Sequence, residues 1–119
     1  MYYDSRDAGC KSPYGAVTCG TEVSLRVYPA PGEAVERVVL AARREFADAW
    51  TEVELSADRT ADGRAFFGGV FTAPEEPELI WYHFRVFWAD GGECCFGKNG
   101  FQPWDALATW QLTVYDGTS

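Results

Sequence analysis

The stretch Leu79–Trp88, LIWYHFRVFW, carries five aromatic rings and the single histidine of the chain. A β-strand points successive side chains to opposite faces, so the stretch divides into two sets. The uniformly apolar set is predicted to lie in a core; it comprises Ile80, Tyr82, Phe84, Val86 and Trp88. The other set is amphipathic and comprises Trp81, His83, Arg85 and Phe87. We expect the amphipathic face to be a half-exposed sheet surface covered by a loop, another domain or a ligand.

Alternation with a period of two recurs along the rest of the chain. It predicts strands over 22–28, 35–42, 50–55, 65–73 and 109–115, separated by turn signals. Asp62 and Gly63 mark a hairpin, and Gly68 and Gly69 indicate either a bulge or room for a large facing ring. The one helix-like segment, 41–50 (AARREFADAW), is interpreted as a continued strand plus a loop. The pattern predicts an all-β, immunoglobulin-like antiparallel β-sandwich of about seven to eight strands, with a small open barrel as the main rival.

The bulk composition limits the number of domains and the class of partner. A chain of 119 residues fits one hydrophobic core, and residues 1–116 are expected to form one module that begins with an extended loop over 1–20. The net charge of −8 argues against nucleic acid and anionic membranes as partners, because both are bound through clustered Lys and Arg. No apolar run reaches the roughly 20 residues that a membrane helix needs. The first residues lack a signal-peptide pattern, so we expect a cytoplasmic location.

The four cysteines have no metal-binding or redox spacing. They are Cys10, Cys19, Cys94 and Cys95, and none forms a C-x-x-C pair. Cys94 and Cys95 are neighbours on a predicted strand and point to opposite faces, so they are poorly placed to hold one metal ion. Reduced, partly buried thiols are the favoured interpretation. A Cys10–Cys19 bridge, or a link from that loop to the later pair, is the alternative.

Catalytic constellations are also missing from the sequence. His83 has no recognisable nucleophile motif to act on, and no phosphate-binding loop occurs. The acidic residues fall mostly in turns and loops, as expected of a solvated surface rather than of a paired-carboxylate site. His83 is therefore interpreted as a tethered surface or loop-packing residue. We expect that this chain alone is not an enzyme and needs no cofactor or metal.

Three stretches point to a known family. YDSRDAGCKSPYGAVTCGTEVSLRV near the start, ELIWYHFRVFWADGGECCFGKNG in the second half and WQLTVYD near the end resemble the N-terminal module of family 13 glycoside hydrolases, the α-amylase, pullulanase and neopullulanase group. Such modules are immunoglobulin-like and are grouped with carbohydrate-binding module family 34. The segment ECCFG departs from the pattern, because an aromatic residue is expected there. In that family the last strand leads into a catalytic (β/α)8 barrel of about 250 residues. The resemblance implies that residues 117–119 begin a linker to such a barrel.

The resemblance implies a non-catalytic accessory domain of an α-glucan-degrading enzyme. Relatives use the module to contact their own barrel, to form a homodimer, or to bind α-glucan. Sugar binding would need exposed rings that stack on glucose, and the rings that we consider for this are Trp104, Trp50, Trp81 and Tyr14. The residues that we consider for domain or dimer interfaces are Tyr3, Tyr14, His83, Arg85 and Phe87.

Each candidate ring also has a purely structural interpretation. Trp81 and Trp50 could be packed at a domain interface or in the core, and Trp104 could pin its own loop. Two other functions stay open as alternatives. One is a dedicated starch-binding or maltooligosaccharide-binding module, and the other is a free-standing immunoglobulin-like interaction domain.

Overall fold

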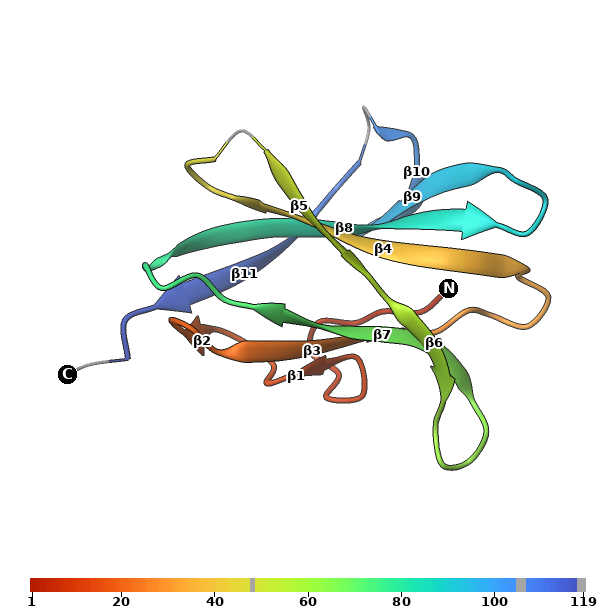
Figure 1. Ribbon diagram of the computed structural model, residues 1–119, viewed down its shortest axis with the longest axis horizontal. Helices are drawn as coiled ribbons and strands as arrows, with labels where there is room; N and C mark the ends of the chain where they lie inside the picture. Colours follow the sequence, from red (N-terminus) through yellow and green to blue (C-terminus); the bar gives the residue numbers. More distant parts are fainter. Residues whose placement is uncertain (48, 105–106, 118–119) are drawn as a thin grey trace.

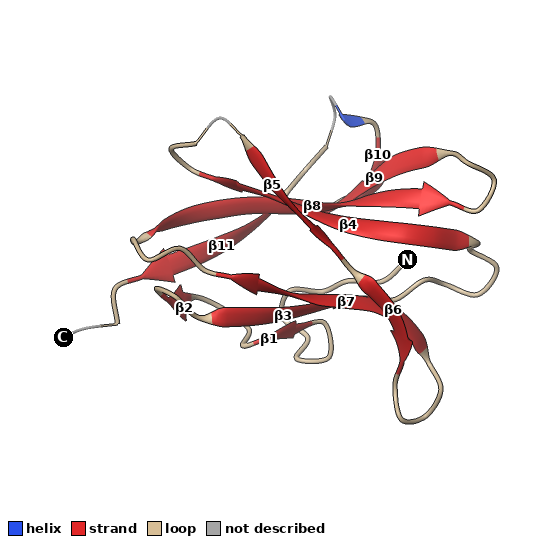
Figure 2. Ribbon diagram, in the orientation of Figure 1, coloured by secondary structure: helices blue, strands red, loops and turns tan. Residues whose placement is uncertain are grey.

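The computed structural model describes residues 1–47, 49–104 and 107–117, and it consists of two β-sheets that pack face to face (Figure 1). Strands make up most of the regular structure (Figure 2). In chain order the strands are β1 (Lys11–Ser12), β2 (Val17–Thr18), β3 (Glu22–Val27), β4 (Val35–Arg44), β5 (Trp50–Glu54), β6 (Ser56–Arg59), β7 (Ala65–Thr72), β8 (Glu78–Trp88), β9 (Glu93–Gly97), β10 (Gly100–Gln102) and β11 (Trp110–Tyr115). The predicted all-β, immunoglobulin-like sandwich is confirmed.

The two sheets differ in size, and one continuous segment of the chain, β5 followed by β6, contributes a strand to each sheet. The smaller sheet has the order β1-β3-β7-β6. The larger sheet has the order β10-β9-β8-β11-β2, and β4 and β5 extend it from β8. The chain passes from the larger sheet in β5 to the smaller sheet in β6 at Leu55, which is buried (Figure 1).

The described chain has more strands than the seven to eight that the sequence predicts. The difference lies in four elements of two to four residues, namely β1, β2, β6 and β10. Segment 1–20, expected as an extended loop, supplies two of them: β1 pairs with β3, and β2 pairs in parallel with β11. Two residues are too few to display a period of two, so the sequence pattern could not indicate these strands.

Strand β8 is the centre of the larger sheet, and one of its edges is divided. Along one edge β4 pairs with β8 from Ile80 to Trp88. The other edge pairs with β11 over Glu78–Tyr82 and with β9 over Phe84–Phe87. His83 therefore lies at the point where β11 ends its pairing with β8 and β9 begins its own.

The apolar face of β8 packs against the smaller sheet, as predicted. Phe84 is fully buried, and the rings of Trp110 and Phe96 surround it. Tyr3, expected at an interface, lies instead in this core with 7% of its surface exposed. Its ring centroid is 5.0 Å from that of Phe84, and its hydroxyl is 2.7 Å from that of Tyr82. Because the Tyr82 hydroxyl is buried and needs a hydrogen-bond partner, Tyr3 is held inside the module and offers little surface to a partner.

Several local predictions are also confirmed. Gly63 has a φ of 90° in the turn between β6 and β7, as the Asp62–Gly63 pair indicates. Segment 41–50 continues β4 to Arg44 and then turns. The register across Gly68 is unbroken, and a Cβ there would lie 2.9 Å from the Phe66 ring, so this glycine makes room for a ring and does not form a bulge.

The four cysteines are free thiols, of which Cys10 and Cys95 are buried. Burial raises the pKa of both thiols above the ordinary value. In residues 1–47, 49–104 and 107–117, no helix is long and apolar enough to cross a membrane. Of the expected linker, 117–119, only Gly117 lies within the described residues.

Candidate functional site

Three rings meet on the outer face of the larger sheet, which is the face directed away from the smaller sheet. His83 of β8 lies under Trp50 of β5 and Trp104, with ring centroids 5.0 Å and 5.1 Å away. The two indoles contact each other edge to face, with centroids 5.5 Å apart. His83 is 0% exposed, whereas Trp104 is 56% exposed. The outer face therefore presents indole surface to solvent and encloses a histidine beneath it. We call these three residues the outer aromatic cluster.

A glycine allows the segment after β10 to reach this cluster. Gly97 is the last residue of β9. It lies on the outer face, as does Cys95, which pairs with Arg85 of β8. A Cβ at Gly97 would lie 2.1 Å from the carbonyl oxygen of Ala108. The backbone of Ala108 and the side chain of Leu107 thus lie directly on Gly97, and the Lys98 amide donates a 2.8 Å hydrogen bond to the Ala108 carbonyl. This contact fixes the end of the segment that carries Trp104.

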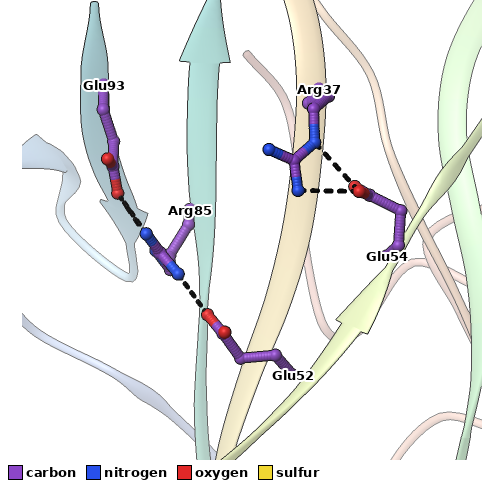
Figure 3. A network of polar contacts seen from close by, with 5 residues as sticks. All are labelled: Arg37, Glu52, Glu54, Arg85 and Glu93. Carbon is purple, nitrogen blue, oxygen red and sulfur yellow. Dashed lines mark hydrogen bonds and ion pairs between the residues drawn. The ribbon is translucent and has the colours of Figure 1, made fainter.

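Charged side chains on the same face pair across four strands (Figure 3). Arg85 of β8 donates to Glu52 of β5 and, at 2.6 Å, to Glu93 of β9. Arg37 of β4 donates to Glu54 of β5 at 2.9 Å and 2.7 Å. The five side chains form a network of hydrogen-bond donors and acceptors beside the exposed indoles.

Phe87 lies between two members of this network. The guanidinium carbons of Arg37 and Arg85 are 4.5 Å and 5.2 Å from the centroid of its ring. Cation–π attraction therefore helps to hold both arginines over the sheet. Phe87 and Arg85, expected at an interface, both lie half-buried on the outer face.

The enclosed histidine is neutral and has no hydrogen-bond partner. Burial, together with the nearby charge of Arg85, lowers the pKa of His83 from 6.5 to about 4, although Glu52 opposes the shift. Neither Nδ1 nor Nε2 of His83 has a partner, and the buried Oε1 of Gln102 also has none. Among the described residues, the only other buried side-chain oxygen or nitrogen without a partner is Oε1 of Glu78. Three of the four such atoms are thus on the outer face.

An open groove of about 490 Å³ runs beside Trp104. It is lined by Glu93, Cys94, Cys95, Phe101, Gln102, Pro103 and Trp104. The groove therefore joins one member of the charged network to the exposed indole and to the amide of Gln102. Within 1–47, 49–104 and 107–117, no group of three or more His, Cys, Asp or Glu side chains is placed to hold a metal ion.

Two other candidate rings are not members of the cluster. Trp81 is half-buried on the outer face, between Arg43 of β4 and Gln111 of β11. Tyr14 is 65% exposed in the N-terminal segment. The Nζ of the buried Lys11 donates to the carbonyls of Pro13 at 2.9 Å and Gly15 at 2.8 Å, on either side of Tyr14. Lys11 thus fixes the backbone that presents Tyr14.

Sequence reasoning missed several residues of the outer face. Gln102, Glu52 and Glu93 carry no motif, and their roles depend on strand pairings between distant segments. Phe46, at the turn after β4, is 87% exposed and was not singled out. Gly97 belongs to the FGKNG turn, where a glycine next to a strand end could have indicated a close backbone approach.

Comparison with known proteins assigns no family to the chain. No protein-family model matches it, and no curated protein is significantly similar in sequence.

Proposed function

We propose that this chain is a non-catalytic accessory module of an α-glucan-degrading glycoside hydrolase, and that its outer aromatic cluster contacts α-glucan. The proposal is supported by the three stretches that resemble the N-terminal modules of family 13 enzymes and by the sandwich fold that such modules have. The single observation that carries it is the exposure of Trp104 on a sheet face that also holds Trp50 and a network of charged side chains.

The chemistry of this face suits a sugar chain. The C–H face of a glucose ring stacks on an indole, while neighbouring polar groups take the hydroxyls. Trp104 offers a half-exposed indole, and the groove beside it presents Glu93 and Gln102 as hydrogen-bonding groups. A shallow, open site of this kind favours weak binding of a chain over tight enclosure of a single sugar.

A binding role also fits the carboxylates better than a hydrolytic role does. Glu52 and Glu93 both pair with Arg85, and Glu54 pairs with Arg37. A glycosidase needs one protonated carboxyl and one free carboxylate facing each other across a bond to be cut. These three groups are engaged with arginines on an exposed sheet face, which favours a structural or ligand-orienting role.

The test is a titration of the purified module with maltohexaose, followed by tryptophan fluorescence. Trp104→Ala should weaken binding at least about fivefold, because the loss of one stacked ring removes ~1 kcal/mol. Tyr115→Ala is the matched control, since it removes an exposed ring of β11 outside the cluster and should leave the affinity unchanged. The module should also release no sugar from starch, pullulan or cyclodextrin. Absence of any fluorescence change at millimolar maltohexaose, or clear turnover, would contradict the proposal.

Contact with a catalytic barrel or with a second copy is the second candidate role, and the geometry of Tyr14 favours it. A ring that is 65% exposed on a loop fixed by Lys11 is a preformed protrusion suited to a partner pocket. If the module forms a dimer through this loop, sedimentation should show a concentration-dependent dimer for the wild type and a monomer for Tyr14→Ala. A monomer for both proteins would exclude the dimer.

A further inference from the structure

The outer face conceals polar atoms that its own residues do not satisfy. His83 is 0% exposed with both ring nitrogens unpaired, and Oε1 of Gln102 is buried and unpaired as well. An unpaired buried polar group costs about 1–3 kcal/mol, so such groups are rare unless something else pairs with them. The His83 nitrogens lie beneath the Trp104 indole, and Gln102 lines the groove beside it, so the unpaired atoms flank one exposed ring, which points to a ligand.

The cover over these atoms is thin on one side. Trp50 extends from β5, but Trp104 has more than half of its surface exposed and contacts the cluster through one edge-to-face arrangement with each neighbour. Rotation of a half-exposed side chain takes nanoseconds or less and needs no change in the sheet. The groove is lined by both Trp104 and Gln102, and His83 lies behind Trp104, so a ligand in the groove reaches His83 once the indole turns away.

The chemistry of the unpaired atoms selects a class of ligand. A neutral imidazole offers one donor and one acceptor, and the amide oxygen of Gln102 offers a second acceptor. A hydroxyl group both donates and accepts, so the hydroxyls of a sugar chain can pair with each kind of atom in this set. The Gln102 oxygen would repel an anion, and the guanidinium of Arg85, which lies near His83, would repel a cation. A neutral polyol is the ligand that satisfies this set.

We propose that His83, beneath Trp104, and Gln102, in the groove beside it, form a polar subsite that binds hydroxyls of a saccharide when the indole turns from His83 onto the sugar face. This inference rests on the proposed function and deepens it, because it assigns recognition of hydroxyl groups to residues that the resting structure encloses. Trp104 stacks on the ligand, whereas His83 and Gln102 select ligands whose hydroxyls can pair with their unpaired atoms.

The decisive variant is His83→Phe, which keeps a ring of similar shape and removes both nitrogens. Binding of maltohexaose should weaken about five- to tenfold, the effect of losing one or two neutral hydrogen bonds. The thermal midpoint should stay the same or rise, because the fold no longer buries unpaired nitrogens. If His83 served only to pack the outer face, His83→Phe would leave the affinity unchanged and lower the thermal midpoint.

Gln102→Leu provides a second route if His83→Phe folds poorly, and it should also weaken binding severalfold. Gln111→Leu is the matched control, since it makes the same chemical change at an exposed position of β11 and should leave the affinity unchanged. In the wild type, the imidazole ¹⁵N shifts of His83 should move when maltohexaose is added.

The outcomes separate the two proposals. If Trp104→Ala weakens binding while His83→Phe and Gln102→Leu bind like the wild type, the polar subsite is overturned and the proposed function survives. If the wild type binds no maltohexaose, both are overturned. If His83→Phe loses affinity, gains stability and keeps the Trp104 effect, both are supported.

Discussion

The two faces of β8 come from one strand, but they treat their polar atoms differently. On the inner face the Tyr82 hydroxyl lies 2.7 Å from that of Tyr3, and the Trp88 indole nitrogen donates to the Cys94 sulfur at 3.2 Å. On the outer face His83 is just as buried, yet neither of its nitrogens has a partner. Burial alone therefore does not distinguish the faces. Apart from Oε1 of Glu78 at the start of β8, the inner face satisfies its polar atoms within the fold, whereas the outer face leaves those of His83 available to a ligand.

The largest expected effect is on the inner face. Phe84→Ala removes a fully buried ring at the centre of the core and should lower the free energy of unfolding by about 3–5 kcal/mol. Chemical denaturation measures this directly. Trp104→Ala, on the outer face, should cost much less because its ring is largely exposed. Equal losses for the two variants would remove the distinction between a core face and a binding face.

The pH dependence of stability tests the burial of His83. Its pKa is about 4 in the folded state and 6.5 in the unfolded state, so the unfolded chain takes up the proton first as pH falls. The wild-type free energy of unfolding should therefore be unaffected by His83 titration above pH 6.5 and should fall by about 3 kcal/mol in total between pH 6.5 and 4.

The measurement is the unfolding free energy of the wild type minus that of His83→Phe across this range, which cancels the titration of carboxylates that both proteins share. A difference that does not vary with pH would mean that His83 is solvated and not enclosed.

The hydrogen bond between the Tyr3 and Tyr82 hydroxyls provides a test on the inner face. Tyr3→Phe strands the Tyr82 hydroxyl in the core and should cost about 1–3 kcal/mol, whereas the double variant Tyr3→Phe, Tyr82→Phe should recover most of that loss. Thermal melting of the single and double variants tests this. If the double variant is as unstable as the sum of the single variants, the two hydroxyls are not coupled, and the polar atoms of the inner face are not satisfied in the way proposed.

The smallest expected effect concerns the charged network of the outer face. Arg85→Gln breaks the pairs with Glu52 and Glu93, but all three side chains are partly exposed, so the loss should be about 1 kcal/mol or less. It should shrink further in 1 M salt, where charges are screened within about 3 Å. Denaturation at low and high salt measures both values. A large loss of unfolding free energy that is the same at low and high salt would mean that the charged network is buried rather than exposed to solvent.

Much of this comparison could be predicted from the sequence, because alternation alone divides β8 into its two faces. Trp50, Trp104 and His83 were each singled out as candidates, but their meeting could not be predicted. It depends on how β11 and β9 divide one edge of β8, and on Gly97 leaving room for the backbone of Ala108. These features come from pairings between segments far apart in the chain, which no local pattern records.

The N-terminal segment was harder to predict for a related reason. Strands β1 and β2 have two residues each, and the positions of Tyr3 and Lys11 are fixed by contacts with Tyr82 and with backbone carbonyls rather than by a strand pattern. Polar composition made the segment look like a loop. Its buried side chains are visible only once the two sheets are placed together.

The most direct test of the binding face is an NMR titration of the ¹⁵N-labelled module with maltohexaose. Amide and indole shifts should move around the outer aromatic cluster, at Trp50, His83 and Trp104, and at Gln102 in the adjoining groove, while the amides of β3 and β7 in the smaller sheet stay in place. Shifts confined to the Tyr14 loop, or no shifts at millimolar sugar, would contradict this prediction.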